Sequence, residues 1–246
     1  MLEFLKDLIY PEKKVCLACE RRYDHSEIEG MCDRCLSRFS FINHFCPVCG
    51  REVIPASLIG DHPCPECQEK RPPYNFARSV FTYAGYPREI LLEFKYGHRP
   101  DLAKPFAHMM RLYYLEYLSD QEIDYIIPVP MHADRKSYRG YNQTERLAEE
   151  LAKLVKIEYK DVLNRIKNSL PLYTLAKEDR KTELEGAFQL KINRDPELFA
   201  DKDILVVDDI ITTGTTASEI SHFILDELKA KNVYVITLSS VPVHVE

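Results

Sequence analysis

Two adjacent carboxylates, Asp208 and Asp209, stand directly before a short run of small residues. The run has hydroxyl side chains around one glycine and consists of Thr212, Thr213, Gly214, Thr215 and Thr216. Threonine hydroxyls donate hydrogen bonds, and a glycine lets the backbone approach an anion closely. Adjacent like charges cost energy unless a ligand or a cation offsets them, so we interpret the pair as part of a binding site. The alternative is two solvated turn residues followed by a helix cap.

The residues on either side predict the elements that would position this site. Residues 204–207 are apolar without alternation, which is typical of a central strand in a parallel sheet covered on both faces, and we expect this strand to end at the carboxylates. Residues 217–229 place their apolar side chains at helical spacing. The first amides of a helix lack intrahelical partners and lie at the positive end of its dipole. Strand, loop and helix together therefore predict a phosphate site.

This stretch resembles the phosphoribosyl-diphosphate (PRPP) loop of type I phosphoribosyltransferases, in which two acids and Thr-Thr-Gly-Thr follow an apolar strand. The resemblance implies that Asp208 and Asp209 bind the ribose 2′- and 3′-hydroxyls and that residues 212–216 hold the 5′-phosphate. It also implies Mg²⁺ on the diphosphate of the ligand.

All eight cysteines lie within the first 67 residues and form four Cys-x-x-Cys pairs. The pairs are Cys16/Cys19, Cys32/Cys35, Cys46/Cys49 and Cys64/Cys67. A Cys-x-x-Cys turn brings two thiolates to one tetrahedral metal, so the spacing predicts two structural Zn²⁺ ions in tandem zinc ribbons. We expect consecutive pairs to share a metal, and a cross-brace between the first and third pairs has the same ligands. We expect His25, His44 and His62 to lie on the surface.

Composition limits the class of protein. A hydrophobic share of 45% and a charged share of 29% are those of a globular protein, and a net charge of −6 argues against a generally basic, DNA-coating surface. No stretch approaches the roughly 18 apolar residues of a membrane span, so we expect no membrane insertion. Charged residues interrupt residues 1–10, which argues against a signal peptide and favours a cytoplasmic location. In that reducing compartment a disulfide scaffold is not expected.

The cysteine distribution divides the chain into a zinc-ribbon domain at 1–72 and a second domain at 73–246, separated near the prolines at 72 and 73. In the second domain, strands are expected at 79–83, 125–130 and 233–238, and helices at 86–96, 102–117 and 142–155. The expected fold class is α/β, a parallel sheet with flanking helices and a ligand at the carboxyl ends of the strands.

Three cations follow the predicted strand at 125–130, namely Arg135, Lys136 and Arg139. We interpret this segment as a loop before the helix at 142–155. Cations crowded at the end of a strand suit a polyphosphate, and the alternative is a solvated basic loop.

The same segment is similar to the ComF family through its Pro-Val-Pro-x-His and Arg-Gly-Tyr-Asn-Gln motifs. Phe-Lys-Tyr-Gly at 94–97, Gly-Ala-Phe at 186–188 and Val-Asp-Asp at 207–209 follow the family order, so the resemblance spans nearly the whole chain. It implies a type I phosphoribosyltransferase-like domain behind a double zinc ribbon, and a pyrophosphate contact at 131–139. It further implies a role in natural transformation and DNA uptake, with single-stranded DNA and competence-machinery proteins such as a DNA-translocating helicase as partners.

Residues 165–188 depart from the family pattern, because Glu183 stands where an Asn is usual and Pro171 begins a segment that replaces a Gln region. Basic residues gather here: Arg165, Lys167, Lys177, Arg180 and Lys181. The acceptor of a transfer reaction would contact this segment. The alternative function, a catalytic phosphoribosyltransferase acting on a small acceptor, therefore stays open, and the sequence identifies no catalytic residue.

Overall fold

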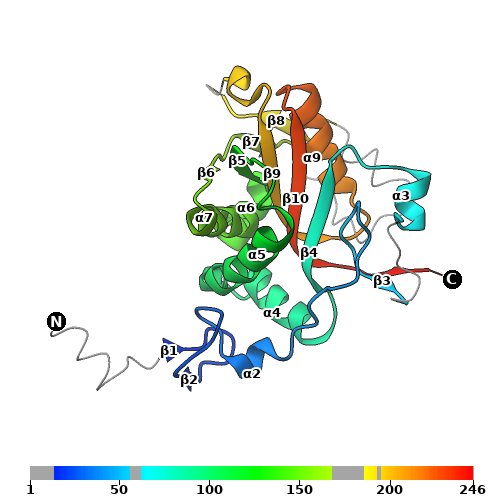
Figure 1. The fold of residues 1–246 in the computed structure, drawn as a ribbon. Coiled ribbons are helices and arrows are strands. Elements are labelled where there is room, and N and C mark those ends of the chain that lie inside the picture. Colours follow the sequence, from blue (N-terminus) through cyan, green and yellow to red (C-terminus); the bar gives the residue numbers. More distant parts are fainter. Residues whose placement is uncertain (1–13, 56–61, 168–185, 193–194, 246) are drawn as a thin grey trace.

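A parallel five-stranded sheet forms the centre of the protein in a computed structural model that describes residues 14–55, 62–167, 186–192 and 195–245. Figure 1 shows the sheet with helices on both of its faces. The strands, in spatial order, are β4 (Phe76–Thr82), β10 (Asn232–Ser240), β9 (Asp203–Ile211), β5 (Tyr125–Pro128) and β6 (Glu158–Tyr159). The predicted α/β class is confirmed.

Strand β9 lies in the middle of the sheet, between β10 and β5. Its apolar start is fully buried, as the unbroken apolar run predicts. The strand does not end at the two carboxylates, and that expectation is wrong. Pairing with β10 continues through Thr237 opposite Asp208 to Ser240 opposite Ile211, because the neighbouring strand is long enough to extend the ladder past the acids.

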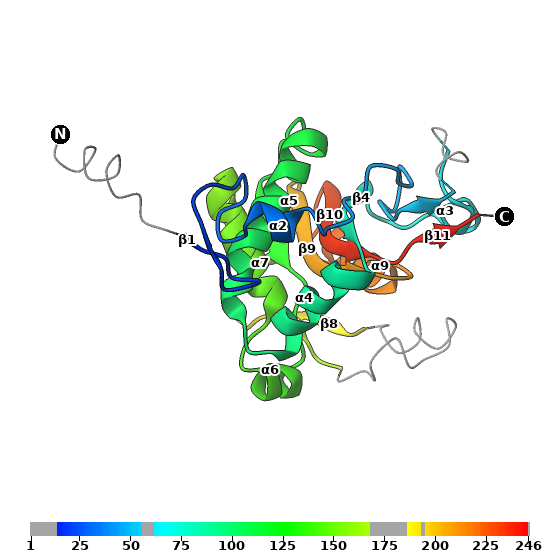
Figure 2. The same ribbon diagram turned by 90° about the horizontal axis from the view of Figure 1, so that it is seen from below.

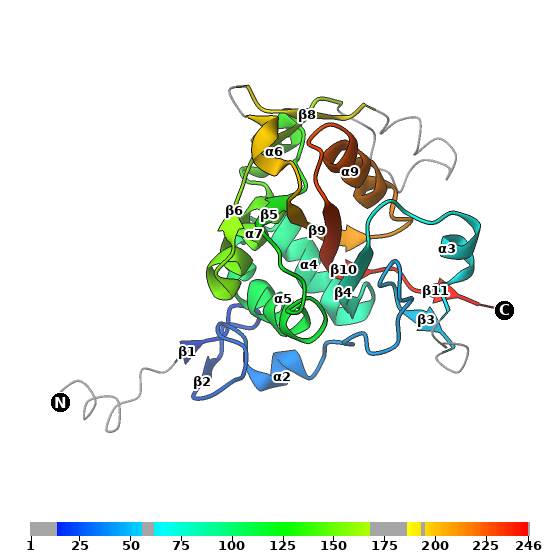
Figure 3. The same ribbon diagram turned by 45° about the horizontal axis from the view of Figure 1, so that its top comes forward.

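Helices cover both faces of the sheet. On one face lie α4 (Gly85–Tyr96), α5 (Ala103–Tyr117) and α7 (Gln143–Val155), and on the other lies α9 (Thr215–Asp226). The view in Figure 3 separates these two layers. The predicted helices are all present, and the aromatic and methionine residues of α5 are core residues: Phe106, Met109, Met110, Tyr113 and Tyr114. Apolar side chains therefore pack against both faces of the sheet.

The cysteine-rich segment forms two small units in different places (Figure 2). The first contains β1 (Lys14–Val15), β2 (Arg22–Tyr23) and α2 (Asp33–Leu36), and its buried residues join the core beneath α4 and α5. The second contains β3 (Val53–Ile54) and α3 (Pro65–Glu69) and has its own apolar cluster. It also bonds to the edge of the sheet, where the Ala77 amide donates to the Val48 carbonyl at 2.8 Å.

The last described strand, β11 (Val243–His244), pairs in parallel with β3 of the second cysteine unit. The Val243 amide donates to the Glu52 carbonyl at 2.7 Å, and the Val245 amide donates to the Ile54 carbonyl at 3.0 Å. Segments from opposite ends of the described chain thus form one small sheet.

Short elements complete the described fold. They are η2 (Pro100–Leu102), α6 (Ala133–Arg139), the antiparallel pair β7 (Leu163–Arg165) and β8 (Phe188–Leu190), and η4 (Pro196–Phe199). Within the described ranges, no helix is long and apolar enough to cross a bilayer. The atypical residues Pro171 and Glu183, and the cations Lys177, Arg180 and Lys181, lie outside the described residues.

Candidate functional site

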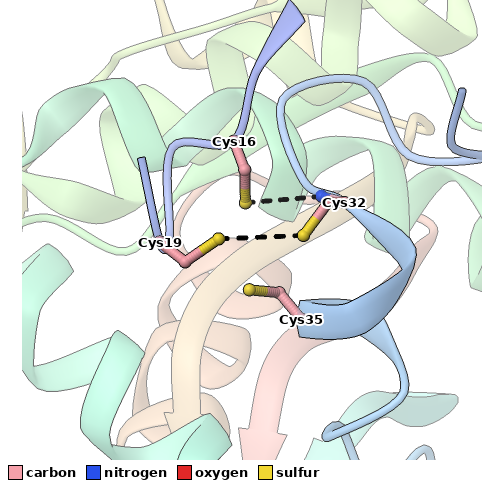
Figure 4. Close-up of side chains that lie close together, drawn as sticks. All are labelled: Cys16, Cys19, Cys32 and Cys35. Atoms are coloured by element: carbon pink, nitrogen blue, oxygen red, sulfur yellow. Dashed lines mark hydrogen bonds between the residues drawn. The ribbon is translucent and has the colours of Figure 1, made fainter. Parts of the chain in front are cut away.

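Two four-cysteine clusters have the geometry of zinc sites. Cys16, Cys19, Cys32 and Cys35 form one, and Cys46, Cys49, Cys64 and Cys67 form the other, with the four sulfurs of each within 4.8 Å of one another. Figure 4 shows the side chains of the first cluster converging on a common centre. The Sγ atoms of Cys19 and Cys32 are 3.8 Å apart, as are those of Cys49 and Cys64. A tetrahedron of sulfurs about 2.3 Å from Zn²⁺ has edges of about 3.8 Å, so both clusters fit the metal. Consecutive pairs share a centre, and the cross-brace does not occur.

The two clusters are built by the same local hydrogen bonds. The Cys16 amide donates to the Arg21 carbonyl and the Cys46 amide to the Arg51 carbonyl, each at 2.9 Å. The Cys32 amide donates to the Cys16 sulfur at 3.4 Å, and the Cys64 amide donates to the Cys46 sulfur at 3.2 Å. Burial raises the pKa of the Cys16 thiol, but backbone N–H groups oppose this effect and leave the pKa at about 7. Amides aimed at sulfur stabilise the thiolates that Zn²⁺ requires.

The histidines near the clusters face the solvent. His25, His44 and His62 are all exposed, as predicted. Neither cluster includes a histidine within the described ranges. The ligand atoms that would hold Zn²⁺ here are therefore sulfurs alone.

A cavity of about 910 Å³ opens at the carboxyl ends of β5 and β9. It is where a parallel sheet with helices on both faces binds its ligands. Among the residues predicted for the site, six line it: Asp208, Asp209, Thr212, Thr216, Arg135 and Arg139. Lys136 does not line it, and neither do Thr213, Gly214 and Thr215. The cavity therefore joins acids, hydroxyls and cations that are far apart in the sequence.

The segment that carries the three predicted cations is the helix α6, so the expectation of a loop is wrong. His132 caps its start, where its Nδ1 accepts the Asp134 amide at 3.3 Å. Gly140 ends it with φ at +85°, a conformation that side chains disfavour. Lys136 points to α7, where its Nζ lies 2.7 Å from an oxygen of Glu145.

Asp208 and Asp209 have different surroundings because successive side chains of a strand point to opposite faces. Asp209 lies on the face covered by α4 and α7 and is buried. One of its carboxylate oxygens is 3.0 Å from Nζ of Lys95, on α4. The other accepts a hydrogen bond from Nε2 of Gln143, on α7. Asp209 is thus held by two helices.

Asp208 lies on the opposite face of β9 and is half-buried. Burial first, and then the neighbouring charge of Asp209, raises the pKa of its carboxyl to about 7. Its Oδ1 accepts the Asp209 amide at 2.8 Å. The positive charges of Lys95 and of Arg165, which comes from β7, oppose the rise, and both residues line the same cavity. A carboxyl group with such a pKa can exchange a proton near neutral pH.

The hydroxyl-rich run connects β9 to α9. Gly214 caps the helix with φ at +74°, and the hydroxyls of Thr213 and Thr215 lie 2.8 Å apart beside it. The first amides of α9 have no intrahelical partners, because they precede the first full turn. Thr212 and Thr216 line the cavity at this point. The arrangement can bind an anion such as phosphate.

Comparison with known proteins finds similar domains in two parts of the chain. Residues 5–69 match the double zinc ribbon domain, and residues 142–244 match the phosphoribosyl transferase domain. Competence protein F of Haemophilus influenzae is 27% identical over 214 residues, covering 85% of this chain and 90% of that protein. Competence protein ComFC of Bacillus subtilis is 26% identical, over 92% of this chain and 95% of that protein. DNA utilization protein YhgH of Escherichia coli K12 is 26% identical, over 80% of this chain and 84% of that protein.

The chain is a homologue of these competence and DNA utilization proteins. Two of the motifs that carry its resemblance to the ComF family pack against each other. The Tyr141 hydroxyl donates to the Phe94 carbonyl, and the Arg139 guanidinium lies 4.6 Å from the centre of the Tyr96 ring. Arg139 also donates to Oε1 of Gln143. The Phe-Lys-Tyr-Gly and Arg-Gly-Tyr-Asn-Gln motifs of this chain therefore form one wall of the cavity.

Lys95, Gln143 and Arg165 all line the cavity. The sequence alone suggests no ligand role for Lys95 or Gln143, and it places Arg165 only in a segment expected to contact an acceptor. Arg99 lies close to Lys95 in the sequence but has other partners: it forms an ion pair with Asp101 at 2.7 Å and donates to the Leu17 carbonyl at 2.6 Å. The available signal for Lys95 and Gln143 was their place inside the two ComF motifs.

Proposed function

We propose that this chain is a cytoplasmic protein of natural transformation that handles incoming single-stranded DNA. In this proposal the cavity at β5 and β9 binds a PRPP-type ligand, that is, a ribose 5-phosphate group. The relatives named competence protein and DNA utilization protein support the cellular role. The observation that carries the ligand class is one cavity containing Asp208, the start of α9 and the cations Arg135 and Arg139.

The proposed contacts follow from chemistry. A carboxylate accepts hydrogen bonds from ribose hydroxyls, helix amides and threonine hydroxyls bind a 5′-phosphate, and arginines bind a diphosphate or a further phosphate of the strand. Mg²⁺ would accompany a diphosphate as part of the ligand. The two zinc centres would hold the cysteine-rich units together, and these units are candidate surfaces for competence-machinery partners such as a DNA-translocating helicase.

The second candidate function is transfer of ribose 5-phosphate from PRPP to a small acceptor. It is favoured by the complete set of two acids, hydroxyl-rich loop and helix start. The chain would then stabilise a departing diphosphate through Arg135 and Arg139, which is electrostatic catalysis without a protein nucleophile.

Calorimetry on the zinc-loaded protein tests the proposal by comparing PRPP with Mg²⁺, a 5′-phosphorylated oligothymidylate and its 5′-hydroxyl counterpart. We expect PRPP to bind and to compete with the 5′-phosphorylated strand. Binding of neither PRPP nor DNA would refute the proposal. Release of pyrophosphate at about 1 per second or faster with a small acceptor would select the enzymatic function instead.

A further inference from the structure

Lys95 and Asp209 form an ion pair in the wall of the cavity. The Lys95 Nζ and an Asp209 carboxylate oxygen are 3.0 Å apart, and the two side chains are only 14% and 8% exposed. Both residues line the cavity, so the pair belongs to its wall. A pair this sheltered from water is screened far less than a surface pair.

The remaining oxygen of Asp209 also has a partner, the side-chain amide of Gln143. That amide group is fixed in turn, because its oxygen accepts a hydrogen bond from Arg139. Each Asp209 oxygen therefore has one donor, and the donors come from two different helices. The contacts hold Asp209 in place before any ligand arrives.

The residues present do not fit a divalent cation at Asp209. Mg²⁺ takes oxygen ligands in a near-octahedral shell, but both oxygens of Asp209 already accept from nitrogen donors, and the ion would stand beside the ammonium group of Lys95, which repels it. Asp208 points to the other face of β9, and in the described part of the chain Lys95 forms its ion pair with Asp209 and acts on Asp208 only through its charge, which lowers the pKa of that carboxyl. Asp208 therefore has a carboxylate oxygen available to a ligand, whereas both oxygens of Asp209 already have partners.

We propose that Lys95 is the resident counter-cation of the acid pair, so that the cavity binds a sugar phosphate without a divalent cation at Asp209. Gln143 acts with it as a positioning residue, and Asp208 is the carboxylate that contacts the ligand. This inference rests on the proposed function, since it specifies how the same cavity recognises a ribose 5-phosphate group. A metal carried by the diphosphate of PRPP is part of the ligand and is compatible with it.

The first test needs no ligand. Electron paramagnetic resonance with Mn²⁺ as the probe is applied to four zinc-loaded proteins: wild type, Asp209→Asn, Lys95→Met, and the double variant Lys95→Met with Asp209→Asn. We expect no Mn²⁺ site at the acid pair in the wild type, a new site in Lys95→Met, and loss of that site in the double variant. A wild-type Mn²⁺ site that Asp209→Asn removes would overturn the inference and leave the proposed function standing.

The second test uses ribose 5-phosphate, which lacks a chelating diphosphate. Its dissociation constant for the wild type should be the same with EDTA and with Mg²⁺, and Lys95→Met should weaken binding in EDTA by roughly tenfold or more. Lys104→Met is the matched control, because Lys104 pairs with Glu29 at 2.6 Å, has a side chain that is 49% exposed and does not line the cavity. Wild-type binding that requires Mg²⁺, or unchanged binding in Lys95→Met, would overturn the inference. If the wild type binds neither this sugar phosphate nor PRPP while the Mn²⁺ results hold, the proposed function fails and the role of Lys95 as counter-cation stands.

Discussion

Arg51 and Val241 join the second cysteine unit to the segment after β10: the Arg51 Nε donates to the Val241 carbonyl at 2.9 Å. The same guanidinium donates to the Pro242 carbonyl at 3.4 Å and forms an ion pair with Glu66 at 2.9 Å. The Arg51 residue is only 6% exposed. Arg51 belongs to the turn that follows Cys46 and Cys49, and its buried side chain connects this turn to α3 and to the two residues before β11.

Replacing Arg51 with Met should loosen β11 from β3, because buried carbonyls lose their donor at a cost of about 1–3 kcal/mol. Hydrogen exchange measures this through the amides of Val243 and Val245, which should exchange faster, while the amides of β9 should not change. Arg146→Met is the control, since Arg146 makes only a 3.5 Å surface contact to Glu149. Equal exchange in both variants would show that Arg51 does not hold the strand.

Zinc content should be two ions per chain in protein purified without added metal. Cys16→Ser should remove one ion and leave the second, because the two clusters share no ligand. Elemental analysis measures the ratio. His62→Ala is the matched control, because His62 is close in sequence to Cys64 but exposed, and it should keep both ions. Loss of zinc on replacing His62 would contradict the all-sulfur site.

The two acids should differ in their effect on stability. Asp209→Asn leaves the ammonium of Lys95 without its charged partner and should lower the free energy of unfolding by about 3 kcal/mol. Asp208→Asn should cost much less, because it breaks no ion pair recorded among the described residues. Asp208→Asn should weaken PRPP binding, by about 1.5–3 kcal/mol for each hydrogen bond lost to a ribose hydroxyl. Denaturant unfolding and calorimetry measure the two effects, and equal stability losses would argue against the asymmetry.

Asp208 should make stability depend on pH. Its pKa is raised from 3.8 to about 7, so the folded protein binds this proton more tightly than the unfolded chain does. The contribution to the free energy of unfolding is complete below pH 3.8 and is lost as the pH rises to about 7. When the pH is raised from about 5 to about 8, the free energy of unfolding of the wild type should fall by about 1–3 kcal/mol more than that of Asp208→Asn. Parallel pH profiles of the two proteins would rule out this titration.

The affinity for single-stranded DNA should fall as the salt concentration rises. The cations that line the cavity should account for this dependence, because they would bind the phosphates of the strand. Arg135→Gln and Arg139→Gln should each flatten the plot of log affinity against log salt by about one unit. Lys136→Gln should leave the slope unchanged, because Lys136 pairs with Glu145 and does not line the cavity. Fluorescence anisotropy with an oligothymidylate at several salt concentrations measures the slopes. A loss of slope in Lys136→Gln alone would place the DNA elsewhere.

Local sequence patterns predict much of this protein. Apolar periodicity identifies the helices and the central strands, and cysteine spacing identifies both clusters, since ribbon spacing demands only local geometry. The sequence does not predict the helix α6, because this helix is short and has no buried residue and therefore shows no apolar periodicity. The partners of Asp209 escape because they depend on how α4 and α7 cross the sheet, which sequence spacing does not encode.

The pairing of β3 with β11 has a consequence for biosynthesis. A ribosome that has just made Arg51 must add 190 residues before Val241 can meet it, and β11 comes later still. The thiolates of the second cluster are all present long before then, so zinc can be captured early while the edge of β3 stays open. Such an edge invites pairing with other chains. Nascent chains stalled before β11 should therefore contain zinc in the second cluster and yet tend to associate. Pairing of β11 with β3 then covers the open edge.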